Sequence, residues 1–147
     1  MRSIGVAIVL GIGFALFIAC GGQQLPNPGW EDRLHKANEI TALWTQLREF
    51  RRQAHMPLDP APQQVPQWLN RPIQEAAKVC PEGHTVPTTC NDVCNLSDDI
   101  CDNAERICVI ADELGKSDDW AQEKCASAKA SCREAKQKCC SCSGGAP

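Results

Sequence analysis

Apolar residues recur every three or four positions between Trp30 and Ala54. They stand at positions 30, 34, 37, 40, 44, 47, 50 and 54, with polar and charged residues between them. This spacing places them on one face of an α-helix of about seven turns. Arginines gather near the end of the stretch, where the helix dipole favours cations, and Pro57 stops the helix. The pattern predicts an amphipathic helix within residues 30–56.

A seven-residue spacing of cysteines marks the C-terminal part of the chain. Cysteines stand at 94, 101 and 108 in one helical segment and at 125, 132 and 139 in the next. Thr89 and Asp92 suit a capping box at the start of the first segment, and Gly115 suits the residue just past its end. Residues 117–119 (Ser-Asp-Asp) suit the start of the second segment. We therefore expect an antiparallel helical hairpin with its tip at 115–117.

The register of this hairpin follows from the residue numbers, because facing residues of two antiparallel helices have numbers that add to a constant. Three cysteine pairs share one total and are predicted to be disulfides: Cys94–Cys139, Cys101–Cys132 and Cys108–Cys125. A disulfide needs Cα atoms within about 7 Å, closer than the usual spacing of about 8–10 Å between helix axes. Small residues in nearly the same register allow this approach: Ala104 with Ala128, Ala111 with Ala121, and Ser97 with Ala135.

Four further cysteines lie outside these three pairs: Cys80, Cys90, Cys140 and Cys142. Extending the register brings Cys90 opposite the end of the second helix, so its partner is Cys142 or Cys140 and Cys80 takes the other. The spacing slightly favours Cys90–Cys142 and Cys80–Cys140. Cross-links suit this region, because Trp120 is the one aromatic residue between positions 80 and 147 and a large apolar core cannot form there.

Proline divides the two helical regions. Residues 57–72 contain five prolines, which favour an extended polyproline II spacer over a packed element. A short helix over 73–79 follows. The sequence therefore predicts an all-α protein with an amphipathic helix at 30–56, a spacer with a short helix at 57–79, and a disulfide-rich hairpin at 80–147.

The N-terminus has the pattern of a signal peptide. Arg2 precedes a short uncharged apolar run, and residues 1–19 end in the stretch LFIAC that contains Cys20. This stretch resembles the lipobox of bacterial lipoproteins. The resemblance implies that Cys20 becomes the acylated first residue, that residues 20–29 form a flexible tether, and that the lipid bilayer is a partner through acylated Cys20. Gly21 in place of Asp is similar to lipoproteins sent to the outer membrane, and the whole chain resembles small cysteine-rich bacterial lipoproteins.

Composition and charge give no sign of nucleic-acid binding or catalysis. The chain has 15 Lys and Arg against 18 Asp and Glu, a net charge of −3. Three acids of the hairpin fall across from three bases, and we expect exposed ion pairs there: Asp98, Asp99 and Asp102 with Lys136, Arg133 and Lys129. Motifs for hydrolases, metalloproteases and phosphate loops are missing. We expect no enzyme, no catalytic residue and no cofactor.

The cysteines also allow two other interpretations. Cys139 and Cys142 form a CxxC motif, but it ends a helix, where the dipole opposes a reactive thiolate. Cys80, His84, Cys90 and Cys94 could form a zinc site, and cysteine-lined helices could hold Cu(I) in a manner that resembles copper-storage bundles. Ten cysteines remain once Cys20 is assigned to the lipid, and this even number in an exported chain favours disulfides, as do the matched pairs. No metal ligand is therefore predicted, and metal sequestration stays the alternative function.

An apolar row runs beside the cysteines of the first hairpin helix: Val93, Ile100, Ile107 and Leu114. A two-helix hairpin cannot bury this row. Either the 30–54 helix folds back over it, which we favour over that helix lying on the membrane surface, or the row is a binding face for another envelope protein. The sequence thus predicts a lipid-anchored module of the cell envelope with a structural or protein-binding role.

Overall fold

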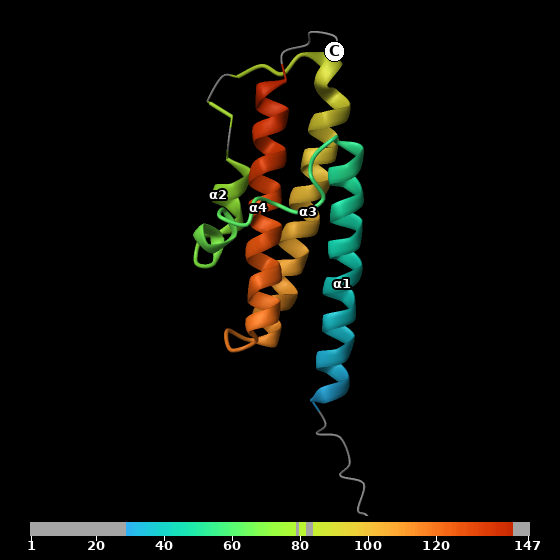
Figure 1. The fold of residues 1–147 in the computed structure, drawn as a ribbon, viewed down its shortest axis with the longest axis vertical. Helices are drawn as coiled ribbons and strands as arrows, with labels where there is room; N and C mark the ends of the chain where they lie inside the picture. Colours follow the sequence, from blue (N-terminus) through green and yellow to red (C-terminus); the bar gives the residue numbers. More distant parts are fainter. Residues whose placement is uncertain (1–28, 79, 82–83, 143–147) are drawn as a thin grey trace, which may run out of the picture.

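The computed structural model describes residues 29–78, 80–81 and 84–142; the predicted signal peptide and Cys20 lie outside this range. The described residues form no strand, and their four α-helices are α1 (Trp30–Gln53), α2 (Ile73–Ala77), α3 (Asn91–Leu114) and α4 (Asp119–Ser141). Two 3₁₀ helices span Val65–Trp68 and Thr88–Cys90. The three long helices lie side by side, and α2 lies against α4 (Figure 1). The predicted all-α fold is confirmed, and within the described residues no helix is long and apolar enough to cross a membrane.

Helices α3 and α4 form the predicted hairpin. Gly115 ends α3 with a φ of 97°, a left-handed conformation that glycine adopts without strain. Asp118 caps α4, because its carboxylate accepts a hydrogen bond from the Ala121 N–H at 3.2 Å. The turn between these two residues is the tip that the sequence indicates.

The start of α3 differs from the expected capping box. The residue that precedes the helix is Cys90, and it makes no side-chain capping hydrogen bond. Instead, the chain enters α3 through the 3₁₀ turn Thr88–Cys90, in which the Cys90 N–H donates to the Pro87 carbonyl at 2.9 Å. The disulfide from Cys90 to Cys142 holds this turn against the end of α4. The covalent link thus fixes an end that the sequence pattern assigned to a polar cap.

Small side chains line the contact between α3 and α4. Ala104, Ala111, Ala121 and Ala128 are completely buried, and Ser97 and Ala135 are nearly so. With no bulky side chain between them, the helices approach closely enough for the Cα atoms of paired cysteines to lie 4.6–4.8 Å apart. This seam is the one that the register predicts.

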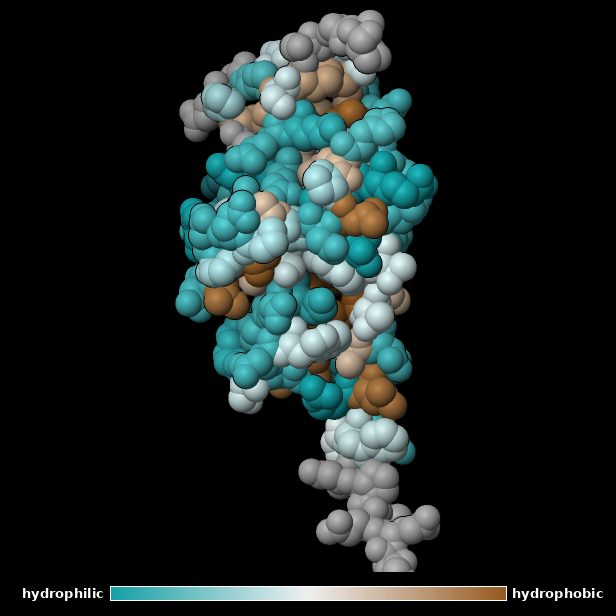
Figure 2. Space-filling model, in the orientation of Figure 1, coloured by the Kyte–Doolittle hydropathy of each residue, from teal (hydrophilic) through white to brown (hydrophobic). Residues whose placement is uncertain are grey.

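Helix α1 packs along α3 and completes the core. Ile40 and Leu47 of α1 are completely buried, and they share one apolar cluster with Ile100 and Ile107 of α3. Ion pairs flank this contact: Arg33 with Asp118 at 2.9 Å, Lys36 with Glu113 at 3.5 Å, and Arg106 with Glu39 at 3.3 Å. The outer surface seen in Figure 2 is mostly hydrophilic, with apolar side chains in small separate patches. The apolar stripe of α1 is therefore used inside the protein from Ile40 onward, whereas Trp30 and Leu34 at its start are 44% and 46% exposed.

The proline-rich segment connects the helices as expected, but it is not an extended spacer. It turns through the 3₁₀ helix Val65–Trp68 and packs against α4, so that Trp68 is 4% exposed. Pro60 is also buried. Prolines restrict this backbone without preventing it from packing, because polar side chains of α1 and α4 bind its carbonyl groups.

Candidate functional site

Ten cysteines form five disulfides, and these are the most distinctive feature of the protein. Three link facing turns of α3 and α4: Cys94–Cys139, Cys101–Cys132 and Cys108–Cys125. Two lie at the open end of the hairpin: Cys80–Cys140 and Cys90–Cys142, with Cα atoms 5.4 and 6.1 Å apart. All five are the pairs that the register favours. We call them the disulfide ladder.

The ladder leaves no described thiol free for other chemistry. The cysteines of the candidate zinc quartet are bound to Cys140, Cys142 and Cys139, and His84 is exposed. No three His, Cys, Asp or Glu side chains of the described residues are placed to hold a metal ion. The two cysteines of the CxxC motif belong to different disulfides. In this arrangement the sulfur atoms of the described cysteines cross-link helices, and these cysteines provide neither a thiolate ligand nor a reactive dithiol.

The rungs of the ladder differ in exposure, and Cys80–Cys140 is the most exposed. Cys132 is completely buried, and Cys108 and Cys125 are 8% and 4% exposed. In contrast, Cys80 is exposed and Cys140 is half-buried. Reductants in solvent therefore reach Cys80–Cys140 more easily than the seam, whereas Cys90 at the same end is completely buried.

The apolar row proposed as a binding face is covered by α1. Ile100 and Ile107 are completely buried, and Val93 and Leu114 are half-buried. Leu47 of α1 packs in the same cluster, with Trp44 and Phe50 at its edge. The interpretation of this row as a docking surface was wrong, because the back-folding of α1 that the sequence favoured uses it as core.

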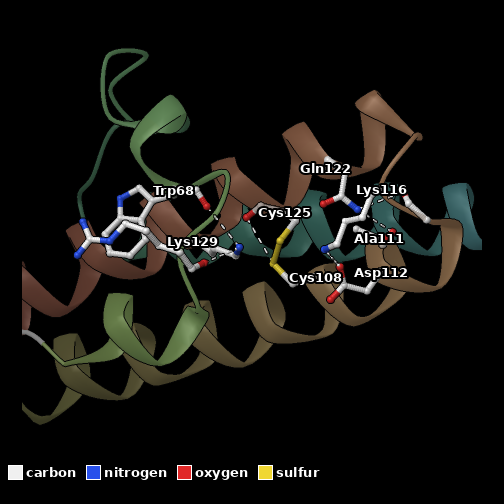
Figure 3. Close-up of a disulfide and its surroundings, with 10 residues drawn as sticks. Trp68, Cys108, Ala111, Asp112, Lys116, Gln122, Cys125 and Lys129 are labelled. Atoms are coloured by element: carbon white, nitrogen blue, oxygen red, sulfur yellow. Dashed lines mark hydrogen bonds and ion pairs between the residues drawn. A yellow bond between two sulfur atoms is a disulfide. The ribbon is translucent and has the colours of Figure 1, made fainter.

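Lys129 of α4 anchors the turn after the 3₁₀ helix Val65–Trp68. Its ammonium group donates to the carbonyl groups of Trp68 at 3.3 Å and Arg71 at 2.8 Å (Figure 3). The side chain is 8% exposed, and burial lowers its pKa below the ordinary value. The Arg71 guanidinium stacks over the Trp68 ring at 4.6 Å, which closes the turn. Lys129, which the sequence predicted to be solvated, is thus buried and holds this turn against α4.

One of the three expected cross-hairpin ion pairs forms. Lys136 pairs with Asp98, as the register predicts. Arg133 donates instead to the Lys78 carbonyl at 3.1 Å, and Lys129 binds the turn described above. The other two pairings were wrong, because the returning segment offers carbonyl groups to both bases. Sequence spacing within the hairpin could not show a segment that lies outside it.

A second polar cluster joins α1, the proline-rich segment and α4. Arg51 is completely buried, and its guanidinium contacts the Glu134 carboxylate at 2.7 Å. It also donates to the carbonyl groups of Pro57 at 2.7 Å and Asp59 at 3.1 Å. Glu134 accepts in turn from the Ala61 N–H at 3.0 Å. By sequence, Arg51 is one of the arginines near the end of the helix. Arg51 also follows Leu47 by four residues and so lies on the apolar face, which is the signal that its side chain is buried.

Replacing Lys129 by methionine tests whether its hydrogen bonds to the turn stabilise the fold. Lys129→Met should lower the free energy of unfolding by about 1.5–3 kcal/mol, because two hydrogen bonds from a charged donor are lost. Chemical denaturation measures this loss. Lys124→Met is the control, since Lys124 lies over the exposed side of the Trp44 ring at 5.2 Å and should change stability by about 1 kcal/mol or less.

The same pair of proteins gives a pH dependence with a definite sign. The pKa of Lys129 is lowered from 10.5 by burial, so the folded protein binds this proton less tightly than the unfolded chain. The stability advantage of wild type over Lys129→Met should therefore grow as the pH rises through the lowered pKa toward 10.5. An advantage that falls over this range would contradict the burial of the ammonium group.

The function of this protein has to be inferred from its own residues. Comparisons with protein-family models, curated proteins and solved structures gave no match. Within the described residues, the polar clusters around Lys129 and Arg51 bind backbone carbonyl groups of the same chain. The ladder and these clusters together make a rigid body whose charged outer faces are available for contact.

Proposed function

We propose that the protein is an exported, lipid-anchored module of the cell envelope with a structural or protein-binding role and no catalytic activity. The observation that carries the proposal is the ladder itself, in which ten cysteines are closed in one consistent register. Disulfides persist in oxidising compartments and are rare where glutathione keeps thiols reduced. A cross-linked hairpin of this kind resists unfolding and proteolysis outside the cytoplasm.

Lipid anchoring is supported by the N-terminal sequence. The stretch LFIAC places Cys20 after a short apolar run, and Gly21 follows it. Gly29 follows Cys20 by nine positions, and an extended chain over that separation reaches about 30 Å. The tether would hold the folded part near the bilayer, on the periplasmic or the outer face of an outer membrane.

Lipid labelling tests the anchor. Cells that produce the full chain are grown with an alkyne-tagged palmitate, and the purified protein is examined for label and for its N-terminal residue. We expect label on the wild type and none on Cys20→Ser, whereas Cys80→Ser keeps it. A wild-type chain without label, or with an N-terminus other than Cys20, would contradict lipid anchoring.

Thiol and metal analysis separates this function from metal sequestration by cysteine thiolates. The exported chain from residue 20 onward, with Cys20→Ser, is treated with an alkylating reagent under non-reducing conditions and weighed intact. We expect a mass without alkyl groups and no stoichiometric zinc or copper. Several alkylated thiols, or bound metal in a fixed ratio, would contradict the structural role of the cysteines and support metal sequestration.

A further inference from the structure

One stripe of α3 stays exposed to solvent. Residues spaced three or four apart form it, and four of the five are acidic: Asp98, Asp102, Glu105, Val109 and Asp112. Val109 is 53% exposed in the middle of these carboxylates. The stripe spans about 21 Å of helix, or about four turns.

The stripe borders a groove on the side of the hairpin that carries α2. Two hollows of about 280 and 290 Å³ lie along it, and both are lined by Ile73, Gln74 and Glu105. The first hollow also contains Asp98 and Asp102, and the second contains Val109 and Asp112. Figure 3 shows the half near the hairpin tip, with Asp112 and Lys116 close to the disulfide of Cys108. Cysteine sulfur atoms and Ile73 thus line the groove together with carboxylates. Three lysines also border it, Lys136 at the first hollow and Lys116 and Lys129 at the second.

The protein's own bases neutralise only part of the acidic stripe, since Asp98 pairs with Lys136 and Asp112 pairs with Lys116. Helix α3 has seven carboxylates and one basic residue, Arg106, which pairs with α1. Asp102 and Glu105 have no ion pair with any described residue. The nearby bases of α4 are occupied, since Lys129 and Arg133 bind backbone carbonyl groups and Lys136 pairs with Asp98. Two neighbouring carboxylates of the described stripe, Asp102 and Glu105, therefore remain uncompensated beside the hollows.

We propose that this groove is the docking site for a basic amphipathic segment of another envelope protein. Lys and Arg side chains of the segment pair with Asp102 and Glu105, and an apolar side chain covers Val109. A helix of about four turns matches the length of the stripe. The proposal rests on the binding role proposed above and gives it a face and a partner chemistry. A metal ion fits less well, because the carboxylates of the described stripe follow one another along the helix and do not converge on one point.

Binding of a synthetic peptide tests the groove. The probe is a four-turn helical peptide of leucine and lysine, titrated by calorimetry into the exported chain from residue 20 onward with Cys20→Ser. We expect binding that weakens as salt is raised, and no binding of the matching leucine–glutamate peptide. Asp102→Asn combined with Glu105→Gln should weaken binding about tenfold, and Val109→Ser about threefold.

A matched control removes two charges elsewhere. Glu31 and Glu123 are exposed and make no ion pair with described residues, so Glu31→Gln with Glu123→Gln changes the net charge equally. This variant should bind the lysine peptide within about twofold of the parent chain. Equal losses for both double variants, no binding at low salt, or self-association that depends on Asp102 and Glu105 would overturn the docking site. None of these outcomes touches the lipid and thiol tests, which judge the proposed function separately.

Discussion

Reduction of all five disulfides is expected to unfold the helical hairpin at room temperature. Each cross-link contributes roughly 2–4 kcal/mol, whereas a whole domain is stable by roughly 5–15 kcal/mol. The seam between α3 and α4 consists of alanine and serine, whose burial removes little apolar surface from water. Circular dichroism after treatment with a phosphine reductant in mild denaturant, followed by removal of the denaturant, should show loss of most helical signal and of a cooperative melt.

A single-rung variant is the control for this experiment. Cys101→Ala with Cys132→Ala removes one cross-link and leaves the rungs on either side of it in place. The hairpin should stay folded with its free energy of unfolding lower by about 3 kcal/mol. A fully reduced chain that keeps its native signal and melts cooperatively would show that packing with α1 holds the hairpin, and that the ladder is dispensable for the fold.

Arg51→Ala is expected to lower the free energy of unfolding by about 3–5 kcal/mol. The substitution leaves the Glu134 carboxylate without its cation and two carbonyl groups of the proline-rich segment without their donor. It also opens a cavity, since the guanidinium is completely buried. Denaturant unfolding gives the stability, and limited proteolysis between residues 57 and 72 should report release of the segment.

Arg48→Ala is the matched control, one turn earlier on the same helix. Arg48 pairs with Asp59 at 3.2 Å, but both side chains are well exposed to solvent. Its loss should change stability by about 1 kcal/mol or less. Arg51→Met with Glu134→Leu should recover part of the loss seen in Arg51→Ala, because no charge is then left unpaired. Similar losses for Arg48→Ala and Arg51→Ala would contradict the difference in burial on which the prediction depends.

The ladder would also hold the proposed docking stripe of α3 in one shape. Cross-links make α3 and α4 one rigid unit, so an exposed stripe on α3 keeps its shape before a partner binds. Helix α1 adds Ile40 and Leu47 to the buried isoleucines of α3, Ile100 and Ile107. Val109 of α3 is not covered in this way and stays 53% exposed.

The spacing of residues along the sequence determines the long helices, the hairpin register and the disulfide pairs of this protein. Apolar spacing sets the limits of α1, and the cysteine spacing sets the hairpin register, because facing positions on antiparallel helices are fixed by their numbers alone. The tip follows from Gly115 and Asp118, whose backbone preferences are local. The alanine seam also follows, since cross-linked helices must approach closely.

The tertiary structure decided the features that depend on segments far apart in the sequence. Trp68 is buried because the proline-rich segment packs against α4. The same packing brings carbonyl groups within hydrogen-bonding distance of Lys129, which therefore binds them and does not pair with Asp102. Arg51 is buried for the same reason, because Pro57 and Asp59 close over it. Carbonyl groups carry no sequence signature, so side-chain patterns alone could not assign these contacts. The structure was likewise needed to show that α1 covers Ile107 and leaves Val109 exposed beside it.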